Sequence, residues 1–232
     1  MNASIFYVGG SKGGVGKSKV SFALIDYLLD EGKKVLLLES DTSNPDVFKA
    51  HQSYENKAIV CREADLDSAD GWIELVDIAA EFPEHFMVIN SAARSNKGLE
   101  KYGLTLRETL VELNRRLLTF WVINRQRDSV ELLRGFLNVF PNTVIHVCRN
   151  LYFGASEKFE LYNTSKSKEL IERKGQTLDF PDLGDRVADK LYSGRMSIKK
   201  ALAELPIGDR AELRRWKIAY TEMFKKAIKV ER

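Results

Sequence analysis

A glycine-rich segment near the N-terminus, SKGGVGKS at residues 11–18, contains two lysines that could each face a phosphate. It meets the Walker A pattern G-x-x-x-x-G-K-[ST], with Ser11 in place of the first glycine. An apolar run precedes it and a stretch with helical spacing follows, so backbone N–H groups and a helix N-terminus would turn toward a phosphate chain. The pattern predicts that Lys17 reaches the β- and γ-phosphates and that the Ser18 hydroxyl ligates Mg²⁺. The predicted nucleotide-binding residues of this loop are Ser11, Lys12, Gly13, Gly14, Val15, Gly16, Lys17, Ser18 and Lys19.

The other lysine carries a resemblance to a known family. KGGVGKS resembles the deviant Walker A motif of the ParA/MinD family of P-loop ATPases, in which a signature lysine occupies the position of Lys12. The resemblance implies ATP and Mg²⁺ as cofactors, and two subunits that face each other across ATP with Lys12 reaching the partner's phosphates. Such a lysine stabilises charge that develops on the γ-phosphate. We therefore expect an ATP-dependent homodimer with Lys12 and Lys17 as catalytic residues; the alternative for Lys12 is a solvated loop lysine.

The second apolar run leads into acidic residues, in KKVLLLESDTSNPDVF. In the family this segment is a switch with two acidic positions, here Glu39 and Asp41, of which the second positions the attacking water. The resemblance makes Asp41 a catalytic and metal-site residue, with Asp46 a less favoured candidate. The usual Pro-Gln is replaced by TSNPD, and a plain turn role for Asp41 is the alternative because Asp before Thr, Ser, Asn and Pro is typical of loops.

The third apolar run, in FMVINSAARSNKG, ends in Asn90 where the family's Walker B segment has an aspartate. An amide keeps the hydrogen bond to a Mg²⁺-bound water but loses the charge. We therefore expect Asn90 to contact the metal through water and hydrolysis to be slow or stimulated by a partner. Residues 91–97 would form the second switch, with Arg94 as its γ-phosphate sensor.

Two later strand ends lie where the family presents residues to the adenine. The resemblance places Arg149 and Asn150 at a purine edge, with Asn124 and Arg125 in the equivalent place one strand earlier. Side-chain amides read a purine by donor and acceptor, but they also commonly cap loops, so both roles stay open here.

The elements that must position these residues alternate along the chain. Short apolar runs predict strands at residues 5–8, 35–38, 86–89, 120–123 and 144–147. Helical spacing predicts helices at residues 18–31, 69–81, 105–117 and 129–139. The alternation predicts an α/β fold, a doubly wound and mostly parallel sheet flanked by helices, with ligands at the carboxyl ends of the strands.

Length and composition are those of a single globular unit. The 232 residues predict one P-loop ATPase domain over residues 1–232, with residues 182–232 as a helical C-terminal part. Apolar runs are too short to span a bilayer, and no leader pattern precedes the first strand, so we expect a cytoplasmic protein. Cys61 and Cys148 lie far apart outside any C-x-x-C, which disfavours a zinc site or an iron–sulfur carrier.

The last third of the chain is basic, within a net charge of +3. Asp209 is expected to cap a final amphipathic helix with an apolar stripe that includes Trp216 and Tyr220. The basic residues expected on its polar face are Arg214, Arg215, Lys217, Lys225, Lys226 and Lys229. The favoured interpretation is a stripe packed on the domain with solvated lysines; the alternatives are nonspecific DNA binding and, less favoured, membrane docking.

The leading functional hypothesis is an ATP-binding switch: a weak ATPase whose homodimer acts in plasmid partition, mobilisation or intracellular positioning, with a protein partner that stimulates hydrolysis. The segment ESDTSNPDVF and Asn90 are similar to plasmid-borne ParA-like proteins of mobilisation and stability regions. The alternatives are a catalytically weak nucleotide-binding adaptor and a metabolic ATP-dependent ligase on the same fold.

Overall fold

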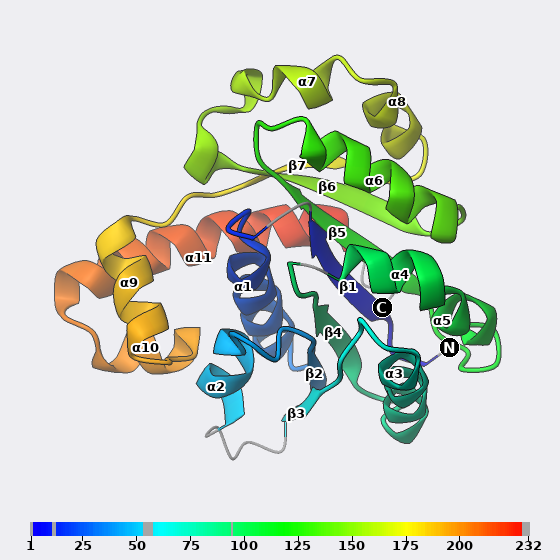
Figure 1. The fold of residues 1–232 in the computed structure, drawn as a ribbon. Coiled ribbons are helices and arrows are strands. Elements are labelled where there is room, and N and C mark those ends of the chain that lie inside the picture. Colours follow the sequence, from blue (N-terminus) through cyan, green and yellow to red (C-terminus); the bar gives the residue numbers. More distant parts are fainter. Residues whose placement is uncertain (1, 11–12, 53–57, 94, 229–232) are drawn as a thin grey trace.

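The computed structural model describes residues 2–10, 13–52, 58–93 and 95–228. Within these residues a parallel seven-stranded sheet forms the centre, in the order β3-β2-β4-β1-β5-β6-β7 (Figure 1). The central strands are apolar and almost fully buried because helices cover both faces of the sheet. The strands are β1 Ile5–Gly10, β2 Val35–Glu39, β3 Ile59–Glu63, β4 Phe86–Asn90, β5 Leu117–Ile123, β6 Val144–Asn150 and β7 Thr177–Phe180.

The helices divide between the two faces of the sheet (Figure 1). One face carries α1 Lys17–Asp30, α2 Asp46–Gln52, α9 Asp185–Ser193, α10 Ile198–Glu204 and α11 Ile207–Ala227. The other carries α3 Ala69–Glu81, α4 Asn96–Tyr102, α5 Leu104–Thr109, α6 Asp128–Val139, α7 Glu160–Asn163 and α8 Lys166–Glu172. Two 3₁₀ turns, η1 Leu151–Phe153 and η2 Ser156–Lys158, join β6 to α7. This confirms the predicted α/β fold and its helical C-terminal segment.

The five predicted strands are confirmed, and most extend a few residues further. The edge strands β3 and β7 were not predicted, because β3 ends in polar residues and β7 has only 4 residues. The predicted helix at 105–117 is wrong beyond Thr109. There Asn114 adopts a left-handed conformation at φ 50, and Leu117 already begins β5.

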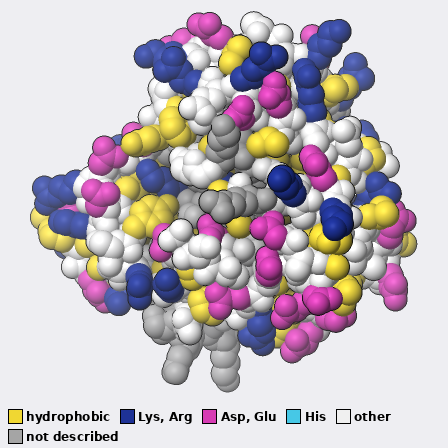
Figure 2. All heavy atoms as spheres, viewed as in Figure 1, with side chains coloured by type: hydrophobic (Ala, Val, Ile, Leu, Met, Phe, Trp, Pro, Cys, Tyr) yellow, Lys and Arg dark blue, Asp and Glu magenta, His cyan; other side chains and the backbone are white. Residues whose placement is uncertain are grey.

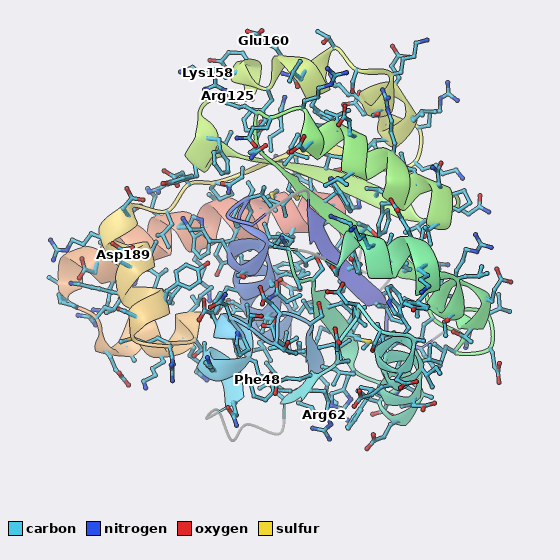
Figure 3. The ribbon with its side chains drawn as sticks, in the orientation of Figure 1. Phe48, Arg62, Arg125, Lys158, Glu160 and Asp189 are labelled. Atoms are coloured by element: carbon cyan, nitrogen blue, oxygen red, sulfur yellow. The ribbon has the colours of Figure 1, made fainter. Side chains whose placement is uncertain are left out.

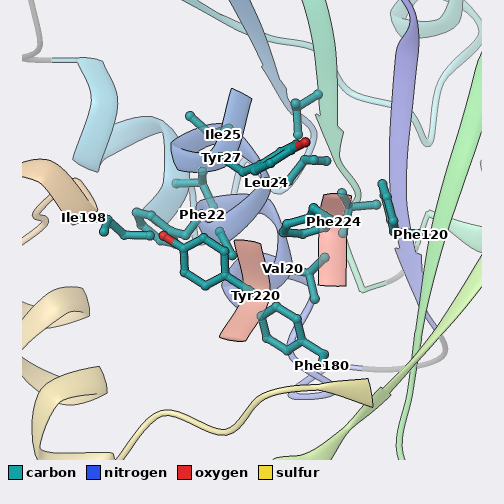
Figure 4. Packing of buried hydrophobic residues seen from close by; sticks show 14 of the residues in the cluster. Val20, Phe22, Leu24, Ile25, Tyr27, Phe120, Phe180, Ile198, Tyr220 and Phe224 are labelled. Carbon is teal, nitrogen blue, oxygen red and sulfur yellow. The ribbon is translucent and has the colours of Figure 1, made fainter. Parts of the chain in front are cut away.

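Helix α11 packs its apolar stripe against α1 and the sheet (Figure 4). Trp216, Tyr220 and Phe224 are fully buried, and the Tyr220 hydroxyl donates a 2.5 Å hydrogen bond to Asp26 of α1. Lys217 forms an ion pair with the same carboxylate at 2.7 Å. The favoured interpretation of this helix, packing on the domain, is therefore confirmed.

The predicted capping role of Asp209 is wrong. The residue that precedes α11 is Pro206, and Asp209 lies in the first turn of the helix. Its carboxylate is buried and pairs with Arg186 at 3.0 Å and Lys190 at 2.5 Å on α9. These ion pairs tie the start of α11 to α9.

Two buried histidines make acid stability a testable property. His51 and His146 are each 3% exposed, and burial lowers the pKa of both to about 4. An unfolded histidine titrates near 6.5, so the unfolded chain binds more protons between these values. The stabilisation is therefore complete above pH 6.5 and is lost as pH falls toward 4, by roughly 1.4 kcal/mol per pH unit for each histidine.

We expect urea unfolding at pH 7.5, 6.5, 5.5 and 4.5 to show this loss, and His146→Leu to remove about half of the slope that the two histidines contribute. His146 suits the test because neither ring nitrogen has a hydrogen-bond partner among the described residues, and the ring stacks on Phe120. An unchanged slope in His146→Leu would contradict the assignment.

Candidate functional site

The glycine-rich loop connects β1 to α1 in the middle of the sheet. Gly14 and Gly16 have positive φ values of 78° and 103°, which residues with a side chain rarely adopt. A Cβ atom on Gly16 would lie 2.3 Å from the amide nitrogen of Asn150, so this glycine is also required for close packing. Ser11 and Lys12 lie outside the described residues, and the predicted trans role of Lys12 stays a prediction.

Lys17 is the first residue of α1 and is only 7% exposed. Burial lowers its pKa to about 8, and the nearby negative charge of Asp41 opposes that shift. Ser18 follows it, half-buried in the first turn of the helix. A cationic side chain and a hydroxyl therefore lie at a helix N-terminus, where the helix dipole also favours an anion.

The ends of β2 and β4 meet beside α1 through a buried hydrogen-bonded network. Glu39 and Asn90 are partners in the β2–β4 register, and the Asn90 amide donates to Glu39 Oε1 at 2.8 Å. The Ser21 hydroxyl, on α1, donates to Asn90 Oδ1 at 2.8 Å. Asn90, which stands where the Walker B aspartate is expected, therefore has its amide hydrogen-bonded to β2 and its side-chain oxygen hydrogen-bonded to α1.

The Glu39 carboxylate is 0% exposed. Burial raises its pKa to about 7, and hydrogen bonds from Asn90 and from the Asp41 N–H oppose the rise. The Phe48 N–H, which lies near the carboxylate, also opposes the rise. Oε2 nevertheless has no hydrogen bond of good geometry among the described residues. A buried acceptor of this kind is costly unless a donor or a cation satisfies it.

The two predicted switch segments are tied together by Ser40. Its hydroxyl donates to the Asn90 carbonyl at 3.1 Å and accepts from the Ala92 N–H at 2.9 Å. Gly13 of the loop lies near this second segment, because a Cβ on it would be 3.7 Å from the Ala93 Cβ. Arg94, the predicted γ-phosphate sensor, lies outside the described residues. Loop and switches therefore form one cluster at the carboxyl ends of the strands.

Asp41 makes the turn contact that was the alternative for it, and its charge also reaches the phosphate loop. Its Oδ1 accepts from the Asn44 N–H at 3.0 Å, which is the expected turn hydrogen bond. Its charge also acts on Lys17 across the loop. Asp46, the less favoured candidate, is instead the first residue of α2. The structure brings Lys17, Ser18 and Asp41 into one neighbourhood, and their catalytic roles stay predictions.

Asn150 and Arg149 are engaged by the protein itself. The Asn150 amide donates to the Val15 carbonyl of the loop at 2.9 Å, and its Oδ1 accepts from the Tyr152 N–H at 3.1 Å. Arg149 pairs with Asp179 of β7 at 2.7 Å. Asn150 therefore braces the phosphate loop from β6; the predicted purine contacts of both residues stay predictions.

One strand earlier, Asn124 serves the loop that follows β5. Its Oδ1 accepts from the Ser129 hydroxyl at 2.8 Å and from the Gln126 N–H at 2.9 Å, which is the loop-capping alternative. Arg125 lines a surface hollow with Lys158 and Glu160 (Figure 3).

Sequence reasoning missed Ser21 and Ser40. Ser21 follows Ser18 by three residues, and this spacing on a helix places both side chains on one face. Ser40 lies between the two acidic switch positions, so alternation along a strand would separate it from both. Neither signal identifies Asn90 as the common partner, because that contact depends on the order of strands in the sheet.

Comparisons with known proteins agree with this geometry. Residues 6–147 match the family described as the CobQ/CobB/MinD/ParA nucleotide binding domain. Protein MobD of Acidithiobacillus ferrooxidans is 56% identical over 218 residues, covering 94% of both chains. Protein TraL of Escherichia coli is 23% identical over 87% of this chain and 88% of its own.

Two solved structures share the fold. A putative plasmid partition protein from Borrelia burgdorferi, bound to AMPPNP, aligns over 97% of this chain and 99% of its own, with a TM-score of 0.61 and 13% identity. MinD of Pyrococcus horikoshii, complexed with Mg-ADP, aligns over 98% and 100%, with a TM-score of 0.60 and 13% identity. From the family match and the relative at 56% identity, the chain belongs to the CobQ/CobB/MinD/ParA family of nucleotide-binding domains.

Proposed function

We propose that the protein is an ATP-dependent molecular switch that binds Mg-ATP at the loop between β1 and α1, dimerises on it and hydrolyses it slowly. The observation that carries this proposal is Lys17, buried at the N-terminus of α1 with Asp41 facing it. A lysine at the N-terminus of a helix, beside the backbone N–H groups of a glycine-rich loop, favours an anion such as a nucleotide phosphate. Solved structures that share the fold are described with ADP, AMPPNP or Mg-ADP.

The residues fit Mg-ATP by their chemistry. Backbone N–H groups of the loop and the Lys17 ammonium would bind the phosphate chain, and Ser18 and Asp41 would hold the metal with its waters. Bound Mg²⁺ neutralises charge on the phosphates. Asn150 fixes the loop from β6, and Asp41 would orient the attacking water.

Partners form the finer part of the proposal. Lys12 would complete the site of a second subunit, and one relative of the fold is described as a complex of MinD with MinC. Nonspecific DNA is the second proposed partner, with a role in plasmid partition or mobilisation. On the face shown in Figure 2, however, Lys and Arg lie mostly along the rim with Asp and Glu between them. On α11, Arg215 and Lys225 pair with Glu212 and Glu222, and Lys229 lies outside the described residues.

Among the described residues, none of the helices combines the length and the apolarity that crossing a bilayer requires.

The proposal is tested by mant-ATP titration with Mg²⁺ and by analytical ultracentrifugation with and without ATP. We expect micromolar or tighter binding and a shift from monomer to dimer with ATP. DNA binding that requires ATP and weakens with salt would support the DNA role. Lack of adenine-nucleotide binding would overturn the whole proposal, whereas binding without dimerisation would overturn only the switch.

Asn90 supports a second candidate, a nucleotide-binding adaptor that does not turn over efficiently, because the amide carries no charge for the metal. Single-turnover hydrolysis separates the two candidates. Hydrolysis of the bound ATP by the wild type, even at a slow rate, would exclude the adaptor, whereas bound ATP that stays intact would exclude the ATPase.

A further inference from the structure

The pairing of Glu39 with Asn90 accounts for the amide at position 90. The two side chains are 0% and 2% exposed, and Asn90 Nδ2 donates to Glu39 Oε1. An aspartate at position 90 would have no N–H to donate. It would instead place a second carboxylate within hydrogen-bond distance of the first, in a buried site where like charges repel strongly.

The two carboxylate oxygens of Glu39 differ in their hydrogen bonds. Oε1 accepts from Asn90 at 2.8 Å and from the Asp41 N–H at 3.1 Å. The Phe48 N–H lies near the carboxylate, but Oε2 has no hydrogen bond of good geometry among the described residues. The carboxylate lies at the end of β2 beside the Ser21–Asn90 contact, which is one helical turn from Ser18. A carboxylate oxygen without a well-placed donor therefore lies near the residues that fit a metal ion, and a cation there would favour its charged form.

We propose that Glu39 supplies from β2 the negative charge that the family pattern places at position 90 on β4, and that Asn90 is the amide that allows it to stay there. This inference rests on the proposed function, because it requires Mg-ATP at the loop. Glu39 is a positioning residue: it acts on the hydration shell of Mg²⁺, which usually keeps several waters, and groups outside the ligand shell orient such waters.

The deciding variant is Glu39→Gln. Glutamine keeps an oxygen for the Asn90 amide and the Asp41 N–H and loses only the charge. The measurement is the dissociation constant of mant-ATP in excess EDTA and in Mg²⁺, with urea unfolding of the unliganded protein. In EDTA, we expect the variant to bind mant-ATP within about twofold of wild type. We expect the increase in mant-ATP affinity that Mg²⁺ gives the wild type to fall by about tenfold or more in the variant. The urea midpoint of unfolding should be unchanged or higher.

A purely structural role for Glu39 makes the opposite prediction. It would lower the unfolding midpoint and leave the Mg²⁺-dependent gain intact, and either result would overturn the inference. Glu63→Gln is the matched control, because Glu63 is the register partner of Glu39 on β3 but is exposed. It should change neither quantity.

A charge swap tests whether the two positions exchange roles. Asn90→Asp alone should lower the unfolding midpoint, since it sets two carboxylates side by side. Glu39→Gln with Asn90→Asp should restore the midpoint and recover most of the Mg²⁺-dependent gain; a double variant no better than Glu39→Gln would overturn the exchange. Failure of the wild type to bind mant-ATP would overturn the proposed function itself. The same Mg²⁺-dependent increase in mant-ATP affinity in wild type and Glu39→Gln would overturn only this inference.

Discussion

Replacing Lys17 with alanine is expected to weaken Mg-ATP binding by roughly 100-fold or more, which corresponds to about 2.7 kcal/mol. Lys17 is 7% exposed at the start of α1, and alanine would leave no side-chain donor there for the phosphates. Charge-assisted hydrogen bonds of this kind contribute about 1.5–3 kcal/mol each, and a phosphate left without its cation pays a desolvation cost as well. Mant-ATP titration checks the prediction, with circular dichroism to establish that the variant is folded.

Two lysine variants serve as comparisons. Lys200→Ala removes the same charge from an exposed position on α10 and should leave the affinity within about twofold. Lys12→Ala should leave binding measurable but remove ATP-dependent dimerisation or turnover. Equal loss of binding from Lys12→Ala and Lys17→Ala would contradict the separate roles of the two lysines.

Arg115→Met is expected to lower the free energy of unfolding by about 3–5 kcal/mol. Arg115 is 5% exposed, and its guanidinium donates to carbonyl oxygens of two separate segments, residues 3–4 and 79–85. The acceptors are Ala3, Ser4, Ala79, Phe82 and His85. Burial lowers its pKa to about 10, so it stays charged at neutral pH. Removing it would take this donor from the buried Ala79 carbonyl and from the part-buried Ala3 and His85 carbonyls at once, and would remove a cation from the C-terminal end of α3, where a cation is favourable.

Urea unfolding at neutral pH measures this loss. Arg116→Met is the matched control, because Arg116 is exposed one residue along the chain and should change stability by about 0.5 kcal/mol or less. Arg115→Lys should be intermediate, since one ammonium cannot reach the acceptors of both segments at once. A loss below about 1 kcal/mol in Arg115→Met would show that water satisfies these carbonyls.

The sequence predicted the central part of the fold well, and the reason is local. The strands from β1 to β6, apart from β3, are continuous apolar runs, and Gly14 to Lys17 carry a spacing that few other structures require. The resemblance to the ParA/MinD family rested on that loop and is confirmed by the family match. The edge strand β3 and the end of α5 were not predicted correctly, because polar edge strands and turns have little hydrophobic periodicity.

By itself, the sequence determined the phosphate loop, the alternation of the central strands with helices and the apolar stripe of α11, because each depends on residues close together in the chain. Only the tertiary structure placed Glu39 against Asn90 and Asn150 over Gly16. These contacts join residues 51 and about 135 positions apart, and they exist because β4 lies between β2 and β1 while β6 ends beside the loop. Sheet order is a property of the whole packed chain. No local pattern could therefore reveal that the amide at position 90 donates a hydrogen bond to a buried carboxylate at position 39.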